Sequence, residues 1–339
     1  MTLAQAQSFL RNINSKDKVA LLFHDDLDGF ASGILLWDYL TQEKNCRNIR
    51  TFPFDLVRFE RDFAEIKGNL ENKTKVIIAD LAPNVICDTL KDLSRTTNIL
   101  YIDHHQKKSP VPKQIVEYRT ASEYPCSRTI YKLIGGREWL AVAGVLSDAG
   151  DKYKENSEFI RSFLEKNKIS LEDYKRRVAD NISNCLIYFS NGKNYGDVFN
   201  LIRDVKDWEN LGKIPGYAKK VEIEVDRFTG DFERSHENIN GINFYFFKPR
   251  FDILQIVVNN ISYQNPEEVY VFASPHEDKI RLSARNQTRK VNMIKLLETG
   301  ITGLKDAGCG GHMPAAGGSI NKKDLATFKE NLKRFKFKH

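Results

Sequence analysis

Residues 19–29 read VALLFHDDLDG, an apolar run that passes directly into a histidine, three aspartates and a glycine. Five consecutive apolar residues are typical of a strand that is buried on both faces of a sheet. After the acidic residues, apolar side chains recur at spacings of four and three residues, which predicts a helix with one apolar face. These side chains are Phe30, Ile34, Trp37 and Leu40.

The same alternation of apolar runs and helical patterns continues through the N-terminal half. Strands are predicted at residues 19–23, 51–54, 76–79 and 99–102. Helices are predicted at residues 1–14, 127–134 and 137–147, with Ser127 as an N-cap. Strands that alternate with helices form parallel sheets with right-handed crossovers. We therefore predict an α/β fold whose N-terminal domain is a parallel sheet with helices on both faces.

The C-terminal half has a different texture. Residues 153–220 are polar and helical in pattern, and further strands are predicted at residues 221–225, 242–247, 269–273 and 279–283. Later segments are predicted to form a helix at 291–297, a glycine-rich loop at 308–312 and a basic amphipathic helix near 322–335. We expect three parts: an N-terminal domain over residues 1–190, a helical connector over residues 191–221, and a smaller mixed-sheet α/β domain over residues 222–339.

Composition argues against several classes of protein. No apolar run among the 339 residues approaches the roughly 18 needed to span a membrane, and the N-terminus lacks the pattern of a signal peptide, so we expect a cytoplasmic protein. The five cysteines are scattered without a C-x-x-C pair, which argues against a zinc site or a disulfide framework. The net charge of +7 is a mild basic bias that does not by itself identify a nucleic-acid-binding protein.

Acidic side chains follow several of the predicted apolar elements. Asp26 and Asp28 follow the first strand, Asp80 follows the strand at 76–79, and Asp148 follows the predicted helix at 137–147. Taken singly, Asp28 is explained equally well as an N-cap, and a lone aspartate at the position of Asp80 is more often a turn or cap residue. Because strand ends of a parallel sheet meet at one edge, where ligands bind, the set together favours a binding site. If the chain stays extended, Asp26 and Asp28 point the same way.

Residues 103–105, Asp-His-His, follow the strand at 99–102. Adjacent side chains on an extended segment point in opposite directions, so His104 and His105 are expected to have different roles, one toward a metal and one toward substrate. Carboxylate oxygens and imidazole nitrogens are together suited to Mn²⁺ or Mg²⁺. The pattern indicates metal-assisted attack on a phosphorus centre.

These residues resemble the four motifs of the DHH phosphoesterase superfamily, in the order Asp26-x-Asp28-Gly29, Asp80, Asp103-His104-His105 and Asp148. That superfamily includes RecJ-like exonucleases, nano-RNases, cyclic-dinucleotide phosphodiesterases and family II inorganic pyrophosphatases. Gly310-Gly311-His312-x-x-Ala315-Ala316-Gly317 is similar to the glycine-rich signature of the C-terminal domain that accompanies DHH domains, and residues 282–285 resemble its arginine strand. The resemblance covers nearly the whole chain, apart from residues 151–222.

The resemblance implies two divalent ions, Mn²⁺ or alternatively Mg²⁺, with Asp80 bridging them. The implied metal ligands are Asp26, Asp28, Asp80, His104 and Asp148, with His24 as a further candidate. His105 and Asp103 are the implied catalytic residues. Substrate phosphate is expected to bind Arg285, Gly310, Gly311 and His312, in a cleft between the two domains.

Three functions fit this resemblance. The first is a single-strand-specific exonuclease that acts on DNA or RNA, which the net charge and the basic run at 333–338 favour. The second is a small-molecule phosphodiesterase or phosphatase acting on short oligonucleotides, cyclic dinucleotides or bisphosphate nucleotides. The third is a non-catalytic replication or repair scaffold, which the complete set of acidic ligands argues against, since their repulsion costs stability without metal. We expect the first, with single-stranded DNA or RNA, or short oligonucleotides, as substrate and a replication or repair protein as a further partner.

Overall fold

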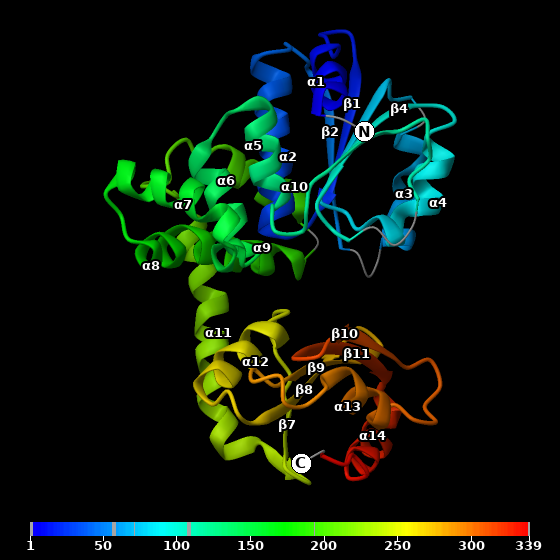
Figure 1. Cartoon of the computed structure of the whole chain (residues 1–339), viewed down its shortest axis with the longest axis vertical. Coiled ribbons are helices and arrows are strands. Elements are labelled where there is room, and N and C mark those ends of the chain that lie inside the picture. Colours follow the sequence, from blue (N-terminus) through cyan, green and yellow to red (C-terminus); the bar gives the residue numbers. More distant parts are fainter. Residues whose placement is uncertain (1–2, 56–58, 71, 107–109, 193, 338–339) are drawn as a thin grey trace. The chain divides into compact units, whose positions relative to one another are not determined.

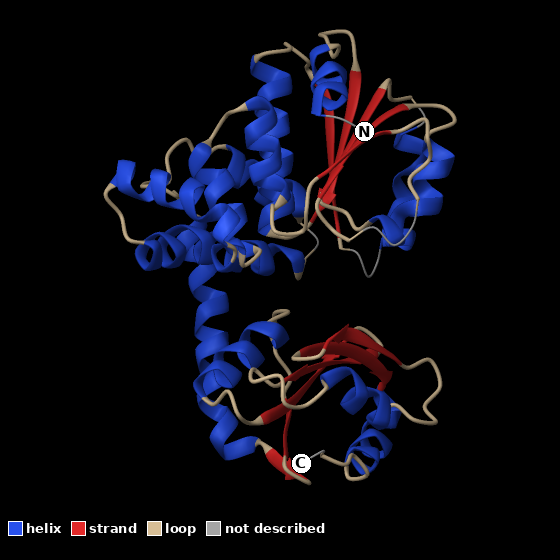
Figure 2. Cartoon of the chain, viewed as in Figure 1, coloured by secondary structure: helices blue, strands red, loops and turns tan. Residues whose placement is uncertain are grey.

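The chain forms two compact units, residues 1–218 and residues 219–339, each with its own sheet (Figures 1 and 2). The structure is a computed structural model. It describes residues 3–55, 59–70, 72–106, 110–192 and 194–337. Residues 1–2 of the predicted first helix and Lys338 of the basic run lie outside the described residues. No helix within these ranges is both long enough and apolar enough to cross a membrane.

The first unit is built on a five-stranded parallel sheet. Its strands are β1 (Lys18–His24), β2 (Asn48–Phe54), β3 (Lys75–Ala79), β4 (Asn98–Asp103) and β5 (Val116–Arg119). The strand order is β2-β1-β3-β4-β5, with every neighbouring pair parallel. The four predicted strands are confirmed. The short fifth strand was not predicted, because its four residues are all half-buried and carry no apolar run.

Helices cover both faces of this sheet, as predicted. In β1, Val19, Leu21 and Phe23 pack into one core, whereas Ala20 and Leu22 pack into another on the opposite face. One face is covered by α2 (Leu27–Gln42), together with α5 (Cys126–Ile134) and α6 (Glu138–Ser147), and the other by α3 (Phe59–Leu70) and α4 (Pro83–Leu93) (Figure 1). The predicted first helix is α1 (Leu3–Arg11).

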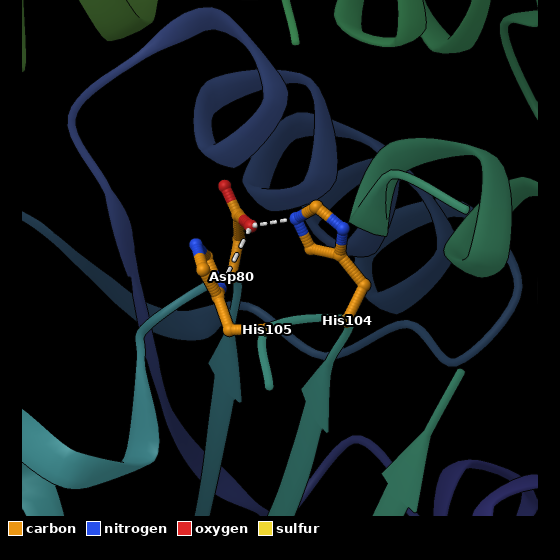
Figure 3. Close-up of side chains that lie close together, drawn as sticks. All are labelled: Asp80, His104 and His105. Carbon is orange, nitrogen blue, oxygen red and sulfur yellow. Dashed lines mark ion pairs between the residues drawn. The ribbon is translucent and has the colours of Figure 1, made fainter. Parts of the chain in front are cut away.

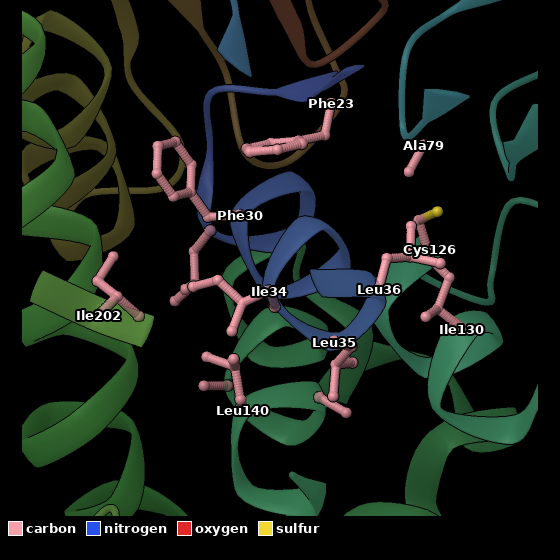
Figure 4. Close-up of a cluster of buried hydrophobic side chains, with 14 of the residues drawn as sticks. Phe23, Phe30, Ile34, Leu35, Leu36, Ala79, Cys126, Ile130, Leu140 and Ile202 are labelled. Carbon is pink, nitrogen blue, oxygen red and sulfur yellow. The ribbon is translucent and has the colours of Figure 1, made fainter. Parts of the chain in front are cut away.

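The helical segment after α6 extends the core of the first unit. It contains α7 (Lys154–Asn167), α8 (Leu171–Tyr174), α9 (Asp180–Ser190) and α10 (Tyr195–Arg203). Phe199 of α10 lies 5.8 Å from Phe23 of β1 and 5.7 Å from Trp37 of α2, measured between ring centroids. Ile202 of α10 belongs to the same cluster, alongside Leu140 of α6 (Figure 4). The helices α7 to α10 therefore share one hydrophobic core with the parallel sheet.

The prediction of a strand at residues 221–225 is wrong, because the segment lies inside the long helix α11 (Ile214–Ser235). The alternation of apolar and acidic residues suggested a strand. In the helix, Val221, Val225 and Phe228 are buried at spacings of four and three, while Ile223 is 59% exposed. The buried side chains therefore follow the period of a helix. The exposed Ile223, between Val221 and Val225, produced the alternating pattern that suggested a strand.

The second unit contains a six-stranded mixed sheet, as predicted. Its strands are β6 (Glu237–Ile239), β7 (Ile242–Phe246), β8 (Val269–His276), β9 (Lys279–Arg285), β10 (Gly308–His312) and β11 (Ala315–Asn321). The order is β10-β11-β9-β8-β7-β6; β7 and β8 are parallel, and the other neighbours are antiparallel. The accompanying helices are α12 (Leu254–Gln264), α13 (Met293–Gly300) and α14 (Leu325–Leu332).

Candidate metal centre

The turn from β1 into α2 brings three predicted residues to the carboxyl edge of the parallel sheet. His24 ends β1, and Asp26 caps α2 by accepting a hydrogen bond of 2.9 Å from the Gly29 backbone N–H. Position 29 requires glycine, since a Cβ there would lie 2.2 Å from the His24 carbonyl oxygen. Asp28 lies in the first turn of α2. The expectation that Asp26 and Asp28 share one extended segment is therefore wrong.

Asp28 is fully buried and is held by the start of α5. Its carboxylate accepts backbone hydrogen bonds from Cys126 (2.6 Å) and Ser127 (3.0 Å), and a further hydrogen bond from the Ser127 hydroxyl. Ser127 was predicted as the N-cap of this helix, but that position is occupied by Pro125. The Ser127 side chain instead fixes an aspartate 99 residues away in the sequence.

Asp80 follows β3 and lies between the two histidines of the next strand end (Figure 3). Its backbone φ of 60° is in the left-handed region, and its side chain is 2% exposed. Asp80 Oδ1 lies 3.3 Å from His104 Nε2 and 3.9 Å from His105 Nδ1, yet it has no hydrogen-bond partner among the described residues. A buried carboxylate oxygen without a partner is costly, and a bound cation would remove that cost.

The two adjacent histidines make different contacts, as expected. His104 Nδ1 lies 3.1 Å from the Ser122 carbonyl oxygen, which leaves Nε2 facing Asp80 and, at 3.6 Å, Asp148 Oδ2. Asp148 itself caps the C-terminus of α6. His105 Nδ1 instead lies 2.7 Å from Asp103 Oδ1.

Asp103 is buried among partners that the sequence did not reveal. Its other carboxylate oxygen, Oδ2, accepts hydrogen bonds from Arg119 Nη1 (2.6 Å) and the Tyr101 hydroxyl (3.0 Å). Arg119 ends β5, the strand that was not predicted, and it also donates to the His105 carbonyl oxygen. Arg119 was missed for that reason, although it stands at a strand end like the other residues of the site.

The candidate ligand atoms gather into three groups, in each of which they lie within 4.8 Å of one another. The groups are Asp80, His104 and His105; His24, Asp26 and Asp80; and Asp28, His104 and Asp148. Asp80 and His104 each belong to two groups. Because the strand order reverses between β1 and β3, the groups lie where doubly wound sheets bind ligands. Mixed carboxylate and imidazole donors of this kind can hold a divalent cation.

The carboxylates of this cluster repel one another and are buried, and both effects shift the pKa values of the site. Burial, followed by the charges of Asp28 and Asp26, raises the pKa of Asp80 well above its usual value. Burial and Asp28 also raise the pKa of Asp148 to about 7. Burial alone would lower the pKa of His24, but the neighbouring carboxylates outweigh it and raise that pKa to about 10. The metal-free site thus holds protons that a divalent cation would displace.

The second unit places its predicted phosphate-binding residues on adjacent strands. Arg285 ends β9 opposite Ala315 of β11, and Ala315 in turn lies opposite His312 of β10. The prediction that Gly310 and Gly311 form a loop is wrong, because both belong to β10. Small side chains there allow a tight hairpin: Gly311 has a φ of +139°, and a Cβ would lie 2.5 Å from the Ala315 carbonyl oxygen.

Arg285 is half-buried without a carboxylate partner among the described residues. Its Nε donates to Asn259 Oδ1 of α12 (2.9 Å), and its Nη1 donates to the Ala284 carbonyl oxygen (2.9 Å). Burial lowers the pKa of Arg285. A positioned guanidinium that lacks an acidic partner is suited to bind an anion.

Comparison with known proteins agrees with these motifs. Residues 18–159 match the model of the DHH family N-terminal domain, and residues 238–336 match the DHHA1 domain. Exonuclease RecJ bound to manganese is similar over 99% of this chain and 96% of its own, with a TM-score of 0.73 and 14% identity.

Two further structures share the fold. RecJ from Thermus thermophilus in complex with Mn²⁺ has a TM-score of 0.69 and 14% identity over 99% of this chain, which spans only 55% of that protein. The pGpG-specific phosphodiesterase PggH from Vibrio cholerae has a TM-score of 0.52 and 13% identity, over 93% of this chain and 98% of its own. The comparison with curated proteins gave no match. The two family domains in this order, with the acidic and histidine motifs of the first gathered at one edge of its parallel sheet, identify the chain as a member of the DHH phosphoesterase superfamily.

Proposed function

We propose that this protein is a metal-dependent exonuclease that releases mononucleotides from single-stranded DNA or RNA. The observation that carries the proposal is the convergence of three donor groups on Asp80 and His104, with the buried Oδ1 of Asp80 lacking a hydrogen-bond partner among the described residues. A donor set of this size exceeds the needs of a structural turn. The similarity to RecJ structures that contain manganese supports the choice of reaction and of metal.

The proposed metal ligands are the members of the three donor groups other than His105. They are Asp26, Asp28, Asp80, His104 and Asp148, with His24 as an additional ligand. Two Mn²⁺ ions, or Mg²⁺ in their place, would make hydroxide available at neutral pH and stabilise the charge that develops on the phosphate. Asp80 suits the bridging position, since it is the carboxylate shared by two groups.

His105 is proposed to act on the substrate rather than on the metal. Asp103 accepts the Nδ1 proton of His105, which leaves the Nε2 lone pair free to take up a proton. Once protonated, Nε2 would donate to a phosphate oxygen or give its proton to the leaving group. Arg119 and Tyr101 hold Asp103 in turn. In this assignment Asp103 positions His105 and does not touch the substrate.

The second unit is proposed to bind substrate phosphate. Arg285, oriented by Asn259, offers a planar donor to phosphate oxygens. Gly310 and Gly311 have no side chains that would cover the backbone of β10. His312 adds a side-chain donor, and it is level with Arg285 across the sheet because both residues lie opposite Ala315. These contacts would select phosphodiesters of nucleic acids.

The experiment that tests this function is digestion of end-labelled single-stranded RNA, DNA and dinucleotides in Mn²⁺. We expect mononucleotides to accumulate from long strands with the wild-type protein, and no hydrolysis with Asp80→Asn or His104→Ala. Near-wild-type turnover in folded Asp80→Asn would overturn the metal assignment. Asn is the appropriate replacement, since it tolerates the left-handed backbone of Asp80.

A second function, hydrolysis of short oligonucleotides or cyclic dinucleotides, is supported by the likeness to PggH. The same digestion distinguishes the two functions, since cleavage restricted to substrates of two or a few nucleotides would indicate the second. Absence of any hydrolysis by the wild-type protein with all substrates would favour a scaffold.

A further inference from the structure

Asp25 lies between two candidate ligands but belongs to none of the three donor groups. It follows β1 directly, and its backbone N–H donates to the Phe54 carbonyl oxygen at the end of β2 (3.0 Å). Its side chain is 18% exposed. A partly buried carboxylate close to several other carboxylates adds electrostatic repulsion, so we asked which contact offsets that cost.

Two contacts define the place of Asp25. Oδ2 accepts a hydrogen bond of 2.6 Å from the Tyr195 hydroxyl. Oδ1 lies 3.7 Å from His24 Nε2. The tyrosine comes from the start of α10, 170 residues away in the sequence, so only the fold brings these groups together.

The His24 ring therefore lies between two sets of carboxylates. Nδ1 lies 2.8 Å from Asp26 Oδ2 and 3.9 Å from Asp80 Oδ2, within a donor group. Nε2 faces Asp25 instead. A metal-binding histidine needs a lone pair on one nitrogen, and a carboxylate opposite the other nitrogen commonly fixes the tautomer and the ring orientation.

We propose that Asp25 and Tyr195 are positioning residues that hold His24 with Nδ1 directed at the cation site. This inference rests on the proposed function, in which His24 is a ligand. Asp25 orients the imidazole through its charge at 3.7 Å, and the Tyr195 hydroxyl fixes the Asp25 carboxylate.

The helix that carries Tyr195 is packed well enough to serve as an anchor. The Tyr195 ring lies 6.5 Å from that of Phe30 in α2, and the ring of Phe199, one turn later, contacts those of Phe23 and Trp37. Residue 195 lies outside both matched regions, 18–159 and 238–336. The residue proposed to hold Asp25 thus lies in α10, a helix that neither matched family domain covers.

The test is Mn²⁺ affinity of the full chain, measured by calorimetry in the absence of substrate. We expect Asp25→Asn to weaken Mn²⁺ binding by about 10–100-fold, as is common when a residue that orients a metal ligand is replaced. Tyr195→Phe, which keeps the ring and removes only the hydroxyl, should weaken it less. Tyr131→Phe is the matched control: Tyr131 is also half-buried and packs on another ring, that of Phe159, and the Mn²⁺ affinity of this variant should not change.

A double-mutant cycle distinguishes positioning from general damage. In a His24→Ala background, Asp25→Asn should have no further effect on Mn²⁺ affinity, because Asp25 acts through His24. Additive losses, or folded Asp25→Asn and Tyr195→Phe proteins with wild-type affinity, would overturn this inference while leaving the proposed function intact. Failure of the wild-type protein to bind Mn²⁺ would overturn both. If Asp25→Asn does not fold, the same comparison with Tyr195→Phe decides the question.

Discussion

At the scale of single residues, the main feature is a group of carboxylates that repel one another. Asp148 has a pKa of about 7, raised from 3.8 by burial and by Asp28. A carboxyl group whose pKa is higher in the folded state binds its proton more tightly there than in the unfolded chain. Asp148 therefore lowers the stability of the metal-free folded state as pH rises from about 4 through about 7. A bound cation reverses this loss by favouring the ionised form.

Stabilisation by metal should consequently depend on pH. We expect Mn²⁺ to raise the Tm more at about pH 8 than at about pH 6, because fewer protons must then be displaced. Thermal unfolding with and without the ion at both values measures this. In Asp148→Asn, which cannot ionise at that position, the difference between the two pH values should shrink. Equal Tm shifts at both values in the wild-type protein would contradict the prediction.

The sequence allowed most residues of the candidate site to be named, but not the residues that contact them. Asp80 and His104 could be predicted because each follows an apolar run of a parallel sheet, and such runs end at one edge. Arg119 and Tyr195 could not, because their roles arise from contacts across the fold rather than from a local pattern. Asp28 was placed in the site, but through an extended geometry that the start of α2 does not have.

At the scale of elements, one glycine sets how closely α6 approaches α5. A Cβ at Gly144 would lie 2.4 Å from Ser127 Oγ and 3.0 Å from Asp28 Oδ1. Any larger residue would push the start of α5 away from the carboxylate that it holds. The packing of two helices is thereby tied to the position of a candidate ligand.

Gly144→Ala should therefore weaken both folding and metal binding. Overpacking of this kind costs about 1–3 kcal/mol, which denaturant unfolding would measure, and Mn²⁺ affinity should fall because Asp28 is displaced. Gly68→Ala in α3 is the control, since no neighbouring atom lies within 4 Å of its Cβ. That change should be neutral or stabilise the helix by up to about 1 kcal/mol. Unchanged Mn²⁺ affinity in Gly144→Ala would contradict the link to the site.

Helices and strands were predicted correctly where a run of residues was continuously apolar. Prediction failed where the pattern fitted both the two-residue period of a strand and the 3.6-residue period of a helix. The strand at 76–79 is continuously apolar and was predicted within a residue of its bounds. Residues 221–225 alternate over a stretch too short to separate a strand from one face of a helix, and α11 is longer than the window that suggested a strand. Glycines made β10 resemble a loop, although its pairing with β11 needs small side chains.

At the scale of the whole molecule, the two units are proposed to divide the work between metal and substrate. Arg285→Ala should lower affinity for single-stranded oligonucleotides by about 10–100-fold, the cost of a lost charged hydrogen bond, while the Mn²⁺-induced Tm shift stays unchanged. Asp80→Asn should instead abolish the Mn²⁺-induced Tm shift and leave the affinity for single-stranded oligonucleotides largely unchanged. Arg281→Ala is the control for Arg285, since Arg281 lies on the same strand but pairs with Asp252. A loss of the metal response in Arg285→Ala would contradict this division.

The left-handed backbone of Asp80 also limits which residues evolution could place there. Glycine, asparagine and aspartate adopt such a φ at less cost than most other residues. If a descendant of this protein gave up hydrolysis, the inherited fold would still favour asparagine or glycine at this position over alanine, serine or glutamate. Asparagine at the end of the corresponding strand would then mark a lineage that kept the fold and lost the chemistry.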